Sequence, residues 1–244
     1  MRSVILGDIH SNLAAFEAVL ADAEAQGGFD AIWCLGDIVG YGPEPHACIH
    51  LLLGYKHICI AGNHDWAAAG RIDISSFNPD AATACRWTAR QLTPEDIDYL
   101  GNLPSSLKQG DFTAVHGSPR QPIWEYILSV SEACDNFGYF DTRFCLVGHS
   151  HIPLVFGRDK TGKCFRAKIP NEVRLDLQGS RLIINPGGVG QPRDGDPRAS
   201  YAIYDDDSQT VYHYRVSYDI ASTQRKMIER GLPLSLALRL NYGY

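Results

Sequence analysis

The chain has 244 residues, of which 45% are hydrophobic and 20% are charged, and its formal net charge is −6. This composition is typical of a soluble globular protein that buries a sizeable core. The sequence has no basic stripe, which argues against a nucleic-acid polymer as the main partner. The first apolar run is too short for a signal peptide, and no segment approaches the ~20 apolar residues of a membrane span. We therefore expect a cytoplasmic protein with no membrane contact.

The first third of the sequence alternates strand and helix patterns. Apolar strands are predicted at 3–6, 31–35 and 57–61. One helix is predicted from the cap-type residues Ser11 and Asn12 to Gly27, and a second from the loop GYGPEP to Leu53. This βαβαβ order favours parallel strands in an α/β sheet.

The middle of the chain is predicted to hold two helices and a hairpin. Asn78-Pro79 and Thr93-Pro94 each combine a cap residue with proline at the first helical position, which predicts helices over 79–91 and 94–101. The segment SLKQGDFTAVHGS is typical of a hairpin, and RFCLV of a further strand.

From residue 152 onward the pattern is mostly that of hairpins. Turns are predicted at RDKTGK, LQGS and YDDDSQ, and a last helix over 219–230, stopped by Gly231-Leu232-Pro233. The longest irregular stretch is 185–200, and loops of this length often carry function. Since no linker is visible, we predict one domain over 1–244.

The seven cysteines are odd in number and contain no Cys-x-x-Cys pair. Cys34, Cys59 and Cys145 lie inside apolar runs. They are predicted to be small buried hydrophobic residues in a reducing cytoplasm, not parts of a disulfide frame or a zinc ribbon.

Five apolar strands each end in metal-capable residues beside a glycine. The five segments are Gly7-Asp8-Ile9-His10, Gly36-Asp37, Gly62-Asn63-His64-Asp65, His116-Gly117 and Gly148-His149-Ser150-His151. Any one of them can be a plain strand-terminating turn. All five together are improbable by chance, and ligands of α/β sheets bind outside the carboxyl ends of the strands. His149 and His151 also share one side of an extended chain, so both can reach one metal ion or two adjacent ions.

In this order, the motifs resemble those of the calcineurin-like metallophosphoesterases, and they cover residues 8–151. The hairpin-rich remainder and Asn185-Pro186-Gly187 resemble the bacterial phosphodiesterase-like branch of that family. The resemblance implies a four-layer αββα sandwich, in which two mixed sheets are flanked by helices. The sequence pattern alone indicates only an α/β beginning and an antiparallel end.

The resemblance also implies two divalent transition-metal ions, for which Mn, Fe, Zn, Ni and Co all suit the mixed nitrogen and oxygen ligands. The implied ligands are Asp8, His10, Asp37 and His151 for the first ion, and Asp37, Asn63, His116 and His149 for the second. Two divalent ions bring four positive charges, whereas Asp8 and Asp37 return only two negative ones. The surplus suits a bridging hydroxide and a phosphoryl group clamped by both ions.

His64 follows an implied ligand, yet in the family the matching histidine binds no metal. The resemblance implies that it protonates or stabilises the leaving oxygen, a general-acid role suited to histidine. The alternative is a histidine that only orients Asn63. Asp65 is a candidate to orient His64 in turn.

The chain departs from the phosphoprotein phosphatase branch at places where that branch grips phosphate. Gly40-Tyr41 replaces an Asp-Arg pair, and Ala61 replaces an arginine. These losses disfavour a phosphoprotein substrate. Arg193 and Arg198 of the 185–200 stretch are candidate replacements, with a solvated turn as the alternative, and Tyr41 is a candidate wall of the cleft.

His46 and His50 have a metal-capable i, i+4 spacing on a predicted helix. With no third ligand apparent, we interpret them as surface or packing residues.

The leading hypothesis is a dinuclear metal-dependent phosphoesterase that hydrolyses a phosphodiester or a small nucleotide-like phosphate. The alternatives are a phosphatase for phosphoproteins or other phosphomonoesters, a non-catalytic metal-binding interaction scaffold, and a structural single-metal protein. His64 and the seven implied ligands count against the scaffold, and a ligand set larger than four counts against the single-metal protein. The oligomeric state is left open.

Overall fold

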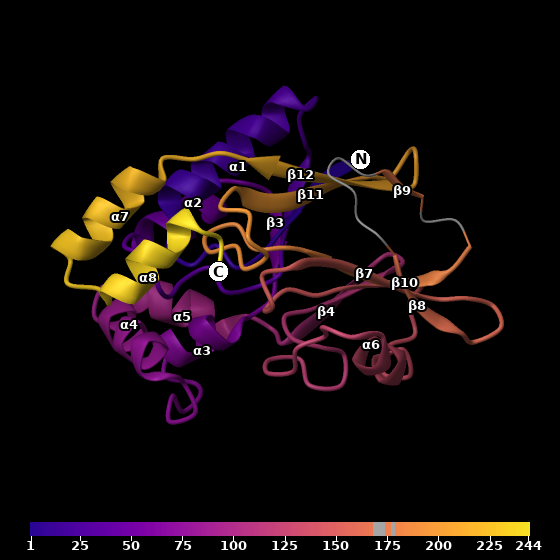
Figure 1. Ribbon diagram of the computed structural model, residues 1–244, viewed down its shortest axis with the longest axis horizontal. Helices are drawn as coiled ribbons and strands as arrows, with labels where there is room; N and C mark the ends of the chain where they lie inside the picture. The colour runs from indigo at the N-terminus through magenta and orange to yellow at the C-terminus, as the bar shows by residue number, and fades with distance from the viewer. Residues whose placement is uncertain (168–173, 177–178) are drawn as a thin grey trace.

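Two six-stranded sheets pack face to face in the computed structural model, which describes residues 1–167, 174–176 and 179–244 (Figure 1). The first sheet has the order β3 (His57–Cys59), β2 (Ala31–Cys34), β1 (Arg2–Leu6), β11 (Ala199–Asp205), β12 (Thr210–Val216) and β9 (Arg174–Asp176). The second has the order β4 (Ser106–Gln109), β5 (Phe112–Val115), β6 (Phe144–Leu146), β10 (Arg181–Pro186), β7 (Pro153–Arg158) and β8 (Cys164–Ala167).

Both sheets are mixed. Strands β1, β2 and β3 run parallel, as the βαβαβ pattern predicts, and β11 joins β1 antiparallel. In the second sheet β5, β6 and β10 run parallel, whereas β4, β7 and β8 pair antiparallel. The carboxyl ends of six parallel strands therefore point to one edge of the sandwich.

Alternation of side chains along β1 shows how the layers form. Ile5 faces the second sheet and packs in a cluster with Trp33 and Phe112, whose ring centroids lie 5.3 Å apart. Val4 and Leu6 point the other way, into the cluster under the first helices. Successive residues of a strand point to opposite faces, so each sheet buries both of its faces.

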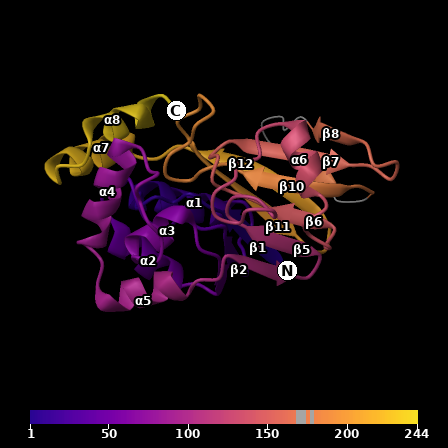
Figure 2. The ribbon, with the colours of Figure 1, turned by 90° about the horizontal axis from the view of Figure 1, so that it is seen from below.

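The helices flank the two sheets on their outer sides. They are α1 (Leu13–Ala25), α2 (Pro45–Leu53), α3 (Asn63–Ala68), α4 (Pro79–Ala89), α5 (Pro94–Asn102), α6 (Val130–Asn136), α7 (Ile220–Glu229), α8 (Leu234–Leu238) and the 3-10 turn η1 (Arg239–Asn241). Helices α1 and α6 lie on opposite sides of the paired sheets, and Figure 2 shows α2 to α5 and α7 to α8 gathered toward one end. The predicted αββα sandwich is confirmed.

The capped helices were predictable from local chemistry. The Asn12 side chain accepts from the Ala15 amide at the start of α1, and Asn78 does the same for Ala81 at α4. Thr93 and Asp96 form a reciprocal capping box at α5. Helices α3, α6 and α8 were not predicted, because five to seven residues are too few for a periodic pattern. The predicted stop after α7 is therefore followed by a further short helix.

Two of the three predicted late hairpins are confirmed, and one is wrong. Strands β7 and β8 pair across RDKTGK, and β11 and β12 pair across YDDDSQ. The strands on either side of LQGS lie in different sheets: β9 pairs with β12, and β10 with β6 and β7. Of that predicted turn, residues 177–178 lie outside the described residues.

The cysteine prediction is confirmed for three residues and wrong for two others. Cys34, Cys59 and Cys145 are buried, as predicted. Cys134 of α6 and Cys164 of β8 form a disulfide, although they are separated by 30 residues in the sequence. The bridge joins α6 to the edge of the second sheet.

Among the described residues, no helix has both the length and the apolar character to cross a membrane.

We expect the denatured, oxidised protein to titrate five thiols, and the reduced protein seven. A Cys134→Ala variant should lose roughly 3–4 kcal/mol of unfolding free energy, the value for closing a loop of this length. Thiol titration and urea unfolding measure the two quantities. Adding reductant should lower the stability of the parent but not of the variant. If the denatured protein titrates seven thiols without reductant, the disulfide between Cys134 and Cys164 does not exist.

Candidate metal centre

The site forms where the carboxyl ends of strands from both sheets meet. Asp8 and His10 follow β1, Asp37 follows β2, and Asn63 opens α3 after β3. From the second sheet, His116 follows β5, while His149 and His151 follow β6. All seven implied ligands are brought together, and each is at most 6% exposed.

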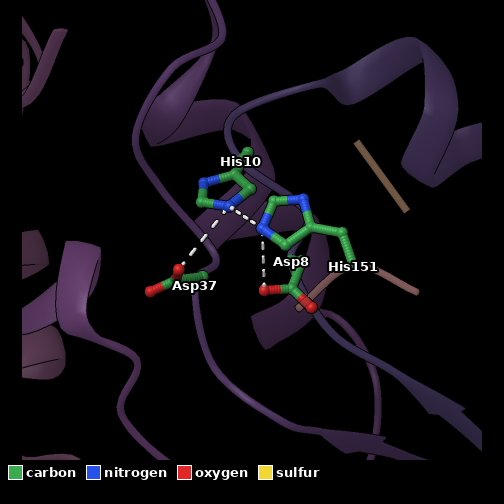
Figure 3. Close-up of side chains that lie close together, drawn as sticks. All are labelled: Asp8, His10, Asp37 and His151. Carbon is green, nitrogen blue, oxygen red and sulfur yellow. Dashed lines mark hydrogen bonds and ion pairs between the residues drawn. The ribbon is translucent and has the colours of Figure 1, made fainter. Parts of the chain in front are cut away.

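One group of ligand atoms comes from Asp8, His10, Asp37 and His151 (Figure 3). The Nε2 atoms of His10 and His151 lie 3.1 Å apart. Asp8 Oδ1 lies 3.3 Å from His151 Nε2, and Asp37 Oδ2 lies 3.5 Å from His10 Nε2. These four ligand atoms lie within 4.8 Å of one another, so they can contact a single ion.

A second group shares Asp37 with the first. Its ligand atoms come from Asp37, His116 and His149. His116 Nε2 lies 3.3 Å from Asp37 Oδ2, 3.1 Å from His149 Nδ1 and 3.2 Å from Asn63 Oδ1. The same carboxylate oxygen therefore faces both groups, as a bridging ligand must.

Each candidate histidine ligand is oriented by a backbone carbonyl at its other ring nitrogen. The pairs are His10 Nδ1 with Val39 O, His116 Nδ1 with Leu35 O, His149 Nε2 with Trp124 O, and His151 Nδ1 with Gln191 O. A carbonyl only accepts, so each of these nitrogens carries the proton. When the ring is neutral, the other nitrogen presents its lone pair to the site, as a histidine ligand of a metal does.

The electrostatics fit bound cations. In His10 and His151, burial lowers the pKa well below its usual range, so the two facing lone pairs repel each other. Burial raises the pKa of Asp8 to about 7, and its Oδ2 has no hydrogen-bond partner among the described residues. For His116, burial acts against protonation, yet the Asp37 carboxylate still raises its pKa to about 10. A buried cluster of this kind needs positive charge, which a proton supplies poorly and a divalent ion supplies well.

The backbone holds the site in a conformation that few residues adopt. Outside glycine, eight described residues have positive φ, and seven of them belong to the site: Asp8, His10, Ser11, Asp37, Tyr41, His149 and His151. Such residues cost free energy and cluster at functional sites. Neither capping nor periodicity in the sequence marks them.

Gly62 shows why a glycine precedes Asn63. A Cβ on Gly62 would lie 2.0 Å from Asp37 Oδ1, which accepts a hydrogen bond from the His64 amide at 2.8 Å. Any side chain at residue 62 would displace the shared carboxylate.

His64 lies against the cluster inside an aromatic surround. Its ring centroid is 4.9 Å from His10, 4.4 Å from Tyr41 and 4.9 Å from Phe77. Burial lowers the pKa of His64 to about 4. Its Nδ1 is buried without a hydrogen-bond partner among the described residues. A Cβ on Gly40 would lie 2.6 Å from that atom, so residue 40 has no room for a carboxylate.

Asp65 does not orient His64, so the prediction that it does so is wrong. Its carboxylate accepts from the amides of Val39 and Gly62, at 3.1 and 3.0 Å. Asp65 thereby holds the loop after β2 against the start of α3.

The two arginines of the 185–200 stretch differ. Arg193 lies 5.7 Å from the Tyr41 ring centroid, and its Nη2 donates to Gln191 Oε1 at 2.9 Å. No carboxylate pairs with Arg193 in the described part of the chain, and its charge acts on Asp8 and His64. Arg198 is neutralised by Asp196 at 2.6 Å, which removes it as a phosphate ligand.

A third group of metal-capable side chains lies apart from the site. His46 Nδ1 is 2.8 Å from Asp96 Oδ2, and the rings of His46 and His50 are 4.1 Å apart. Asp96 is therefore the third candidate ligand that the sequence analysis did not find. The residue comes from α5, and spacing within α2 cannot reveal it.

Three residues that contact or shape the site, Trp124, Tyr126 and Asn185, were not predicted as site residues from the sequence. Trp124 and Tyr126 border His149, the first through its carbonyl and the second by stacking at 4.0 Å. Asn185 donates to Gly148 O and Ser150 Oγ, at 2.7 and 3.0 Å, and so shapes the loop that carries His149 and His151. The Asn-Pro-Gly sequence was the only local signal for the last of these.

Comparison with known proteins places the chain among relatives. The model of the calcineurin-like phosphoesterase superfamily domain matches residues 1–209. The uncharacterized protein MJ0912 of Methanocaldococcus jannaschii is 38% identical over 98% of this chain and 97% of its own length. The crystal structure of a metallophosphoesterase from Sphaerobacter thermophilus is 50% identical, with a TM-score of 0.90 over 100% of this chain and 99% of that one. A symmetrical bis(5'-nucleosyl)-tetraphosphatase of Glaesserella parasuis serovar 5 is 33% identical over 27% of this chain and 25% of its own.

The αββα fold and the clustered histidines and carboxylates define a phosphoester hydrolase with candidate metal ligands. The chain belongs to the calcineurin-like phosphoesterase superfamily.

Proposed function

We propose that this protein is a dinuclear metal-dependent phosphoesterase acting on a phosphodiester or a small nucleotide-like phosphate. The observation that carries the proposal is the position of Asp37 Oδ2, 3.5 Å from His10 Nε2 and 3.3 Å from His116 Nε2. One carboxylate oxygen that serves two ligand groups is the arrangement of a two-metal site. When bound, two divalent ions polarise the phosphoryl oxygen and activate the attacking water.

In this proposal the chain's own residues bind and orient the substrate and assist departure of its leaving group. Asp8, His10, Asp37 and His151 would hold one ion, and Asp37, Asn63, His116 and His149 would hold the other. Arg193 contacts a non-bridging phosphoryl oxygen, because its cation faces the site and has no carboxylate partner among the described residues. His64 donates a hydrogen bond or a proton to the leaving oxygen. Tyr41 packs against both His10 and His64 and keeps their rings in place.

The low pKa of His64 determines which protonation state of its ring assists the leaving group. A ring whose pKa is about 4 is neutral at pH 7, and it then stabilises the leaving oxygen through a single N–H. The negative charge of a phosphoryl group beside the ring favours the protonated form, which would supply a full proton. Either form assists the departure of a poor leaving group.

The substrate class follows from which cations are present and which are missing. Of the candidate phosphate-binding arginines only Arg193 is available, so a diester monoanion suffers less from the deficit than a monoester dianion. The local similarity to symmetrical bis(5'-nucleosyl)-tetraphosphatases supports a nucleotide-like substrate.

We further propose a single domain, a cytoplasmic location and manganese as one suitable metal. Nucleic-acid polymers remain disfavoured by the net charge of −6.

A phosphomonoesterase is the second candidate, and the position of Arg193 favours it. One guanidinium beside the metal ligands can compensate in part for the two arginines missing at Tyr41 and Ala61. An interaction scaffold is disfavoured, because the chain keeps His64 together with every implied ligand.

The test is a panel of substrates under one manganese condition. We expect the highest kcat/KM for bis-aryl phosphate or a nucleotide diester, lower values for a nucleoside monophosphate, and the lowest for a phosphopeptide. An Arg193→Gln variant should lose roughly 10-fold on every ester, the value of about one charge-assisted hydrogen bond.

Arg198→Gln serves as the matched control, since that arginine is already paired with Asp196. Its kcat/KM should equal that of the parent. A phosphopeptide turned over ten times faster than every diester would reverse the substrate assignment in favour of the monoesterase.

A further inference from the structure

Two large aromatic side chains lie exposed beside the candidate metal centre, on the segment between β5 and α6. Trp124 and Tyr126 are 41% and 42% exposed. The Tyr126 ring stacks on the His149 ring with centroids 4.0 Å apart and an interplanar angle of 8°. The carbonyl of Trp124 lies 3.2 Å from Nε2 of the same histidine. Both residues are therefore in contact with a candidate metal ligand while remaining open to solvent.

The segment that carries them is tied down by polar contacts. Between the two aromatic residues, Glu125 accepts hydrogen bonds from Ser118 Oγ and Asn136 Nδ2 and pairs with Arg120. At its start, the Gly117 amide donates to Pro122 O at 2.6 Å. The two rings are therefore presented by a held segment, which lowers the entropy cost of binding a ligand against them.

The aromatic surface continues toward His64. Phe77 lies edge-on to Trp124 with centroids 5.9 Å apart, and 4.9 Å from the His64 ring. Arg193 lies 5.7 Å from the ring centroid of Tyr41, whose ring lies 4.4 Å from that of His64. One side of the site thus presents aromatic rings, next to the cation that is suited to a phosphoryl group.

We propose that Trp124 and Tyr126 form a subsite for a flat aromatic ring of the substrate, a nucleobase in a nucleotide ester. The inference rests on the proposed phosphoesterase function and names its substrate class. Aromatic rings bind bases by stacking, because every base has a π face. Tyr41 cannot serve in this way: it is 7% exposed, and its ring packs against His10 and His64.

The test compares two esters with the same leaving group: the p-nitrophenyl ester of thymidine 5'-monophosphate and methyl p-nitrophenyl phosphate. The parent should prefer the nucleoside ester in kcat/KM. In Trp124→Leu this preference should fall about tenfold, within the range measured for stacking on one base. Trp124→Phe should restore most of it, since a ring is present again. The backbone carbonyl that orients His149 is unchanged in both variants.

Tyr55→Leu is the control, because Tyr55 is an exposed aromatic residue that precedes β3, at the opposite edge of the sheet. Its preference ratio should equal that of the parent. An equal fall in the control and in Trp124→Leu, or an unchanged ratio in Trp124→Leu, would overturn the subsite.

A binding measurement separates the subsite from the chemistry. Calorimetry on the manganese-loaded protein should give a Kd for thymidine 5'-monophosphate that rises about tenfold in Trp124→Leu, and a Kd for inorganic phosphate that does not change. If the parent hydrolyses neither ester, the proposed function fails, yet this titration still decides the subsite. Equal changes in both Kd values would contradict it.

Discussion

Replacing Asp37 by asparagine should abolish the two-metal site while leaving the fold intact. The substitution keeps the shape of the side chain but removes its charge and one of its two acceptor oxygens. Oδ2 of Asp37 is the atom that faces both His10 and His116, so both ions lose a ligand at once. We expect the affinity for the metals to fall by at least about 100-fold, since even an outer partner of a ligand contributes 10–100-fold. Hydrolysis should fall below detection at micromolar metal.

The measurement is elemental analysis after desalting, combined with calorimetric titration of manganese. The parent should hold two ions per chain and the variant none. His50→Ala is the matched control, because it removes a ligand of the separate His46, His50 and Asp96 group. That control should still hold two ions with unchanged activity. The bridging assignment would be refuted if the parent holds only one ion at saturating metal and Asp37→Asn still binds that ion. The melting temperature of the metal-free proteins verifies folding.

Replacing His64 by alanine should separate metal binding from turnover. His64 is 4% exposed, contacts the candidate ligand His10 edge-on and contributes only its backbone amide to Asp37. The backbone amide survives the substitution, so both ions should remain bound. The side chain supplies the proton or hydrogen bond for the leaving oxygen, which is typically worth 10²–10⁴-fold in rate. We expect a loss of that size for an unactivated dialkyl or nucleotide diester.

The leaving group supplies an internal control for this variant. A p-nitrophenolate leaves without protonation, so the loss for bis-p-nitrophenyl phosphate should be much smaller, about tenfold or less. An equal loss on both esters would instead indicate that His64 only orients Asn63. Metal content is measured on the same samples, and a variant that loses an ion would reassign His64 as a structural support of the centre.

The strand ends show how far local patterns reach. The candidate ligands all lie within four residues of the end of a short apolar run, and a glycine stands at each of these ends. Such runs form buried strands, and parallel strands present their carboxyl ends to one edge of a sheet. The sequence was therefore enough to predict that Asp8 and Asp37 would meet, whereas His116 follows a strand of the second sheet and joins them only through the packing of the two sheets. The capped starts of α1, α4 and α5 were predictable for a similar reason, because capping depends on residues only a few positions apart.

Other features depend on contacts between residues that are far apart in the chain. Asp96 joins His46 across two helices, and Cys134 meets Cys164 across 30 residues. Strand β9 pairs with β12 and not with β10, although a turn pattern lies between β9 and β10. Local spacing contains no information about such partners, because each pairing depends on how whole layers pack.

The identity of the site was thus determined by the sequence, and its environment by the tertiary structure. Apolar runs, glycines and the order of the aspartates and histidines place candidate metal ligands at the strand ends, and their resemblance to the family motifs indicates a phosphoesterase. Only packing decided that a side chain on residue 40 would collide with Nδ1 of His64. Packing also decided that Arg193 faces the ligands while Arg198 pairs with Asp196, and that Trp124 stays exposed beside His149. The physical reason is that burial, charge pairing and positive φ are properties of the assembled fold. They arise from neighbours supplied by other segments, and no single segment of the chain encodes them.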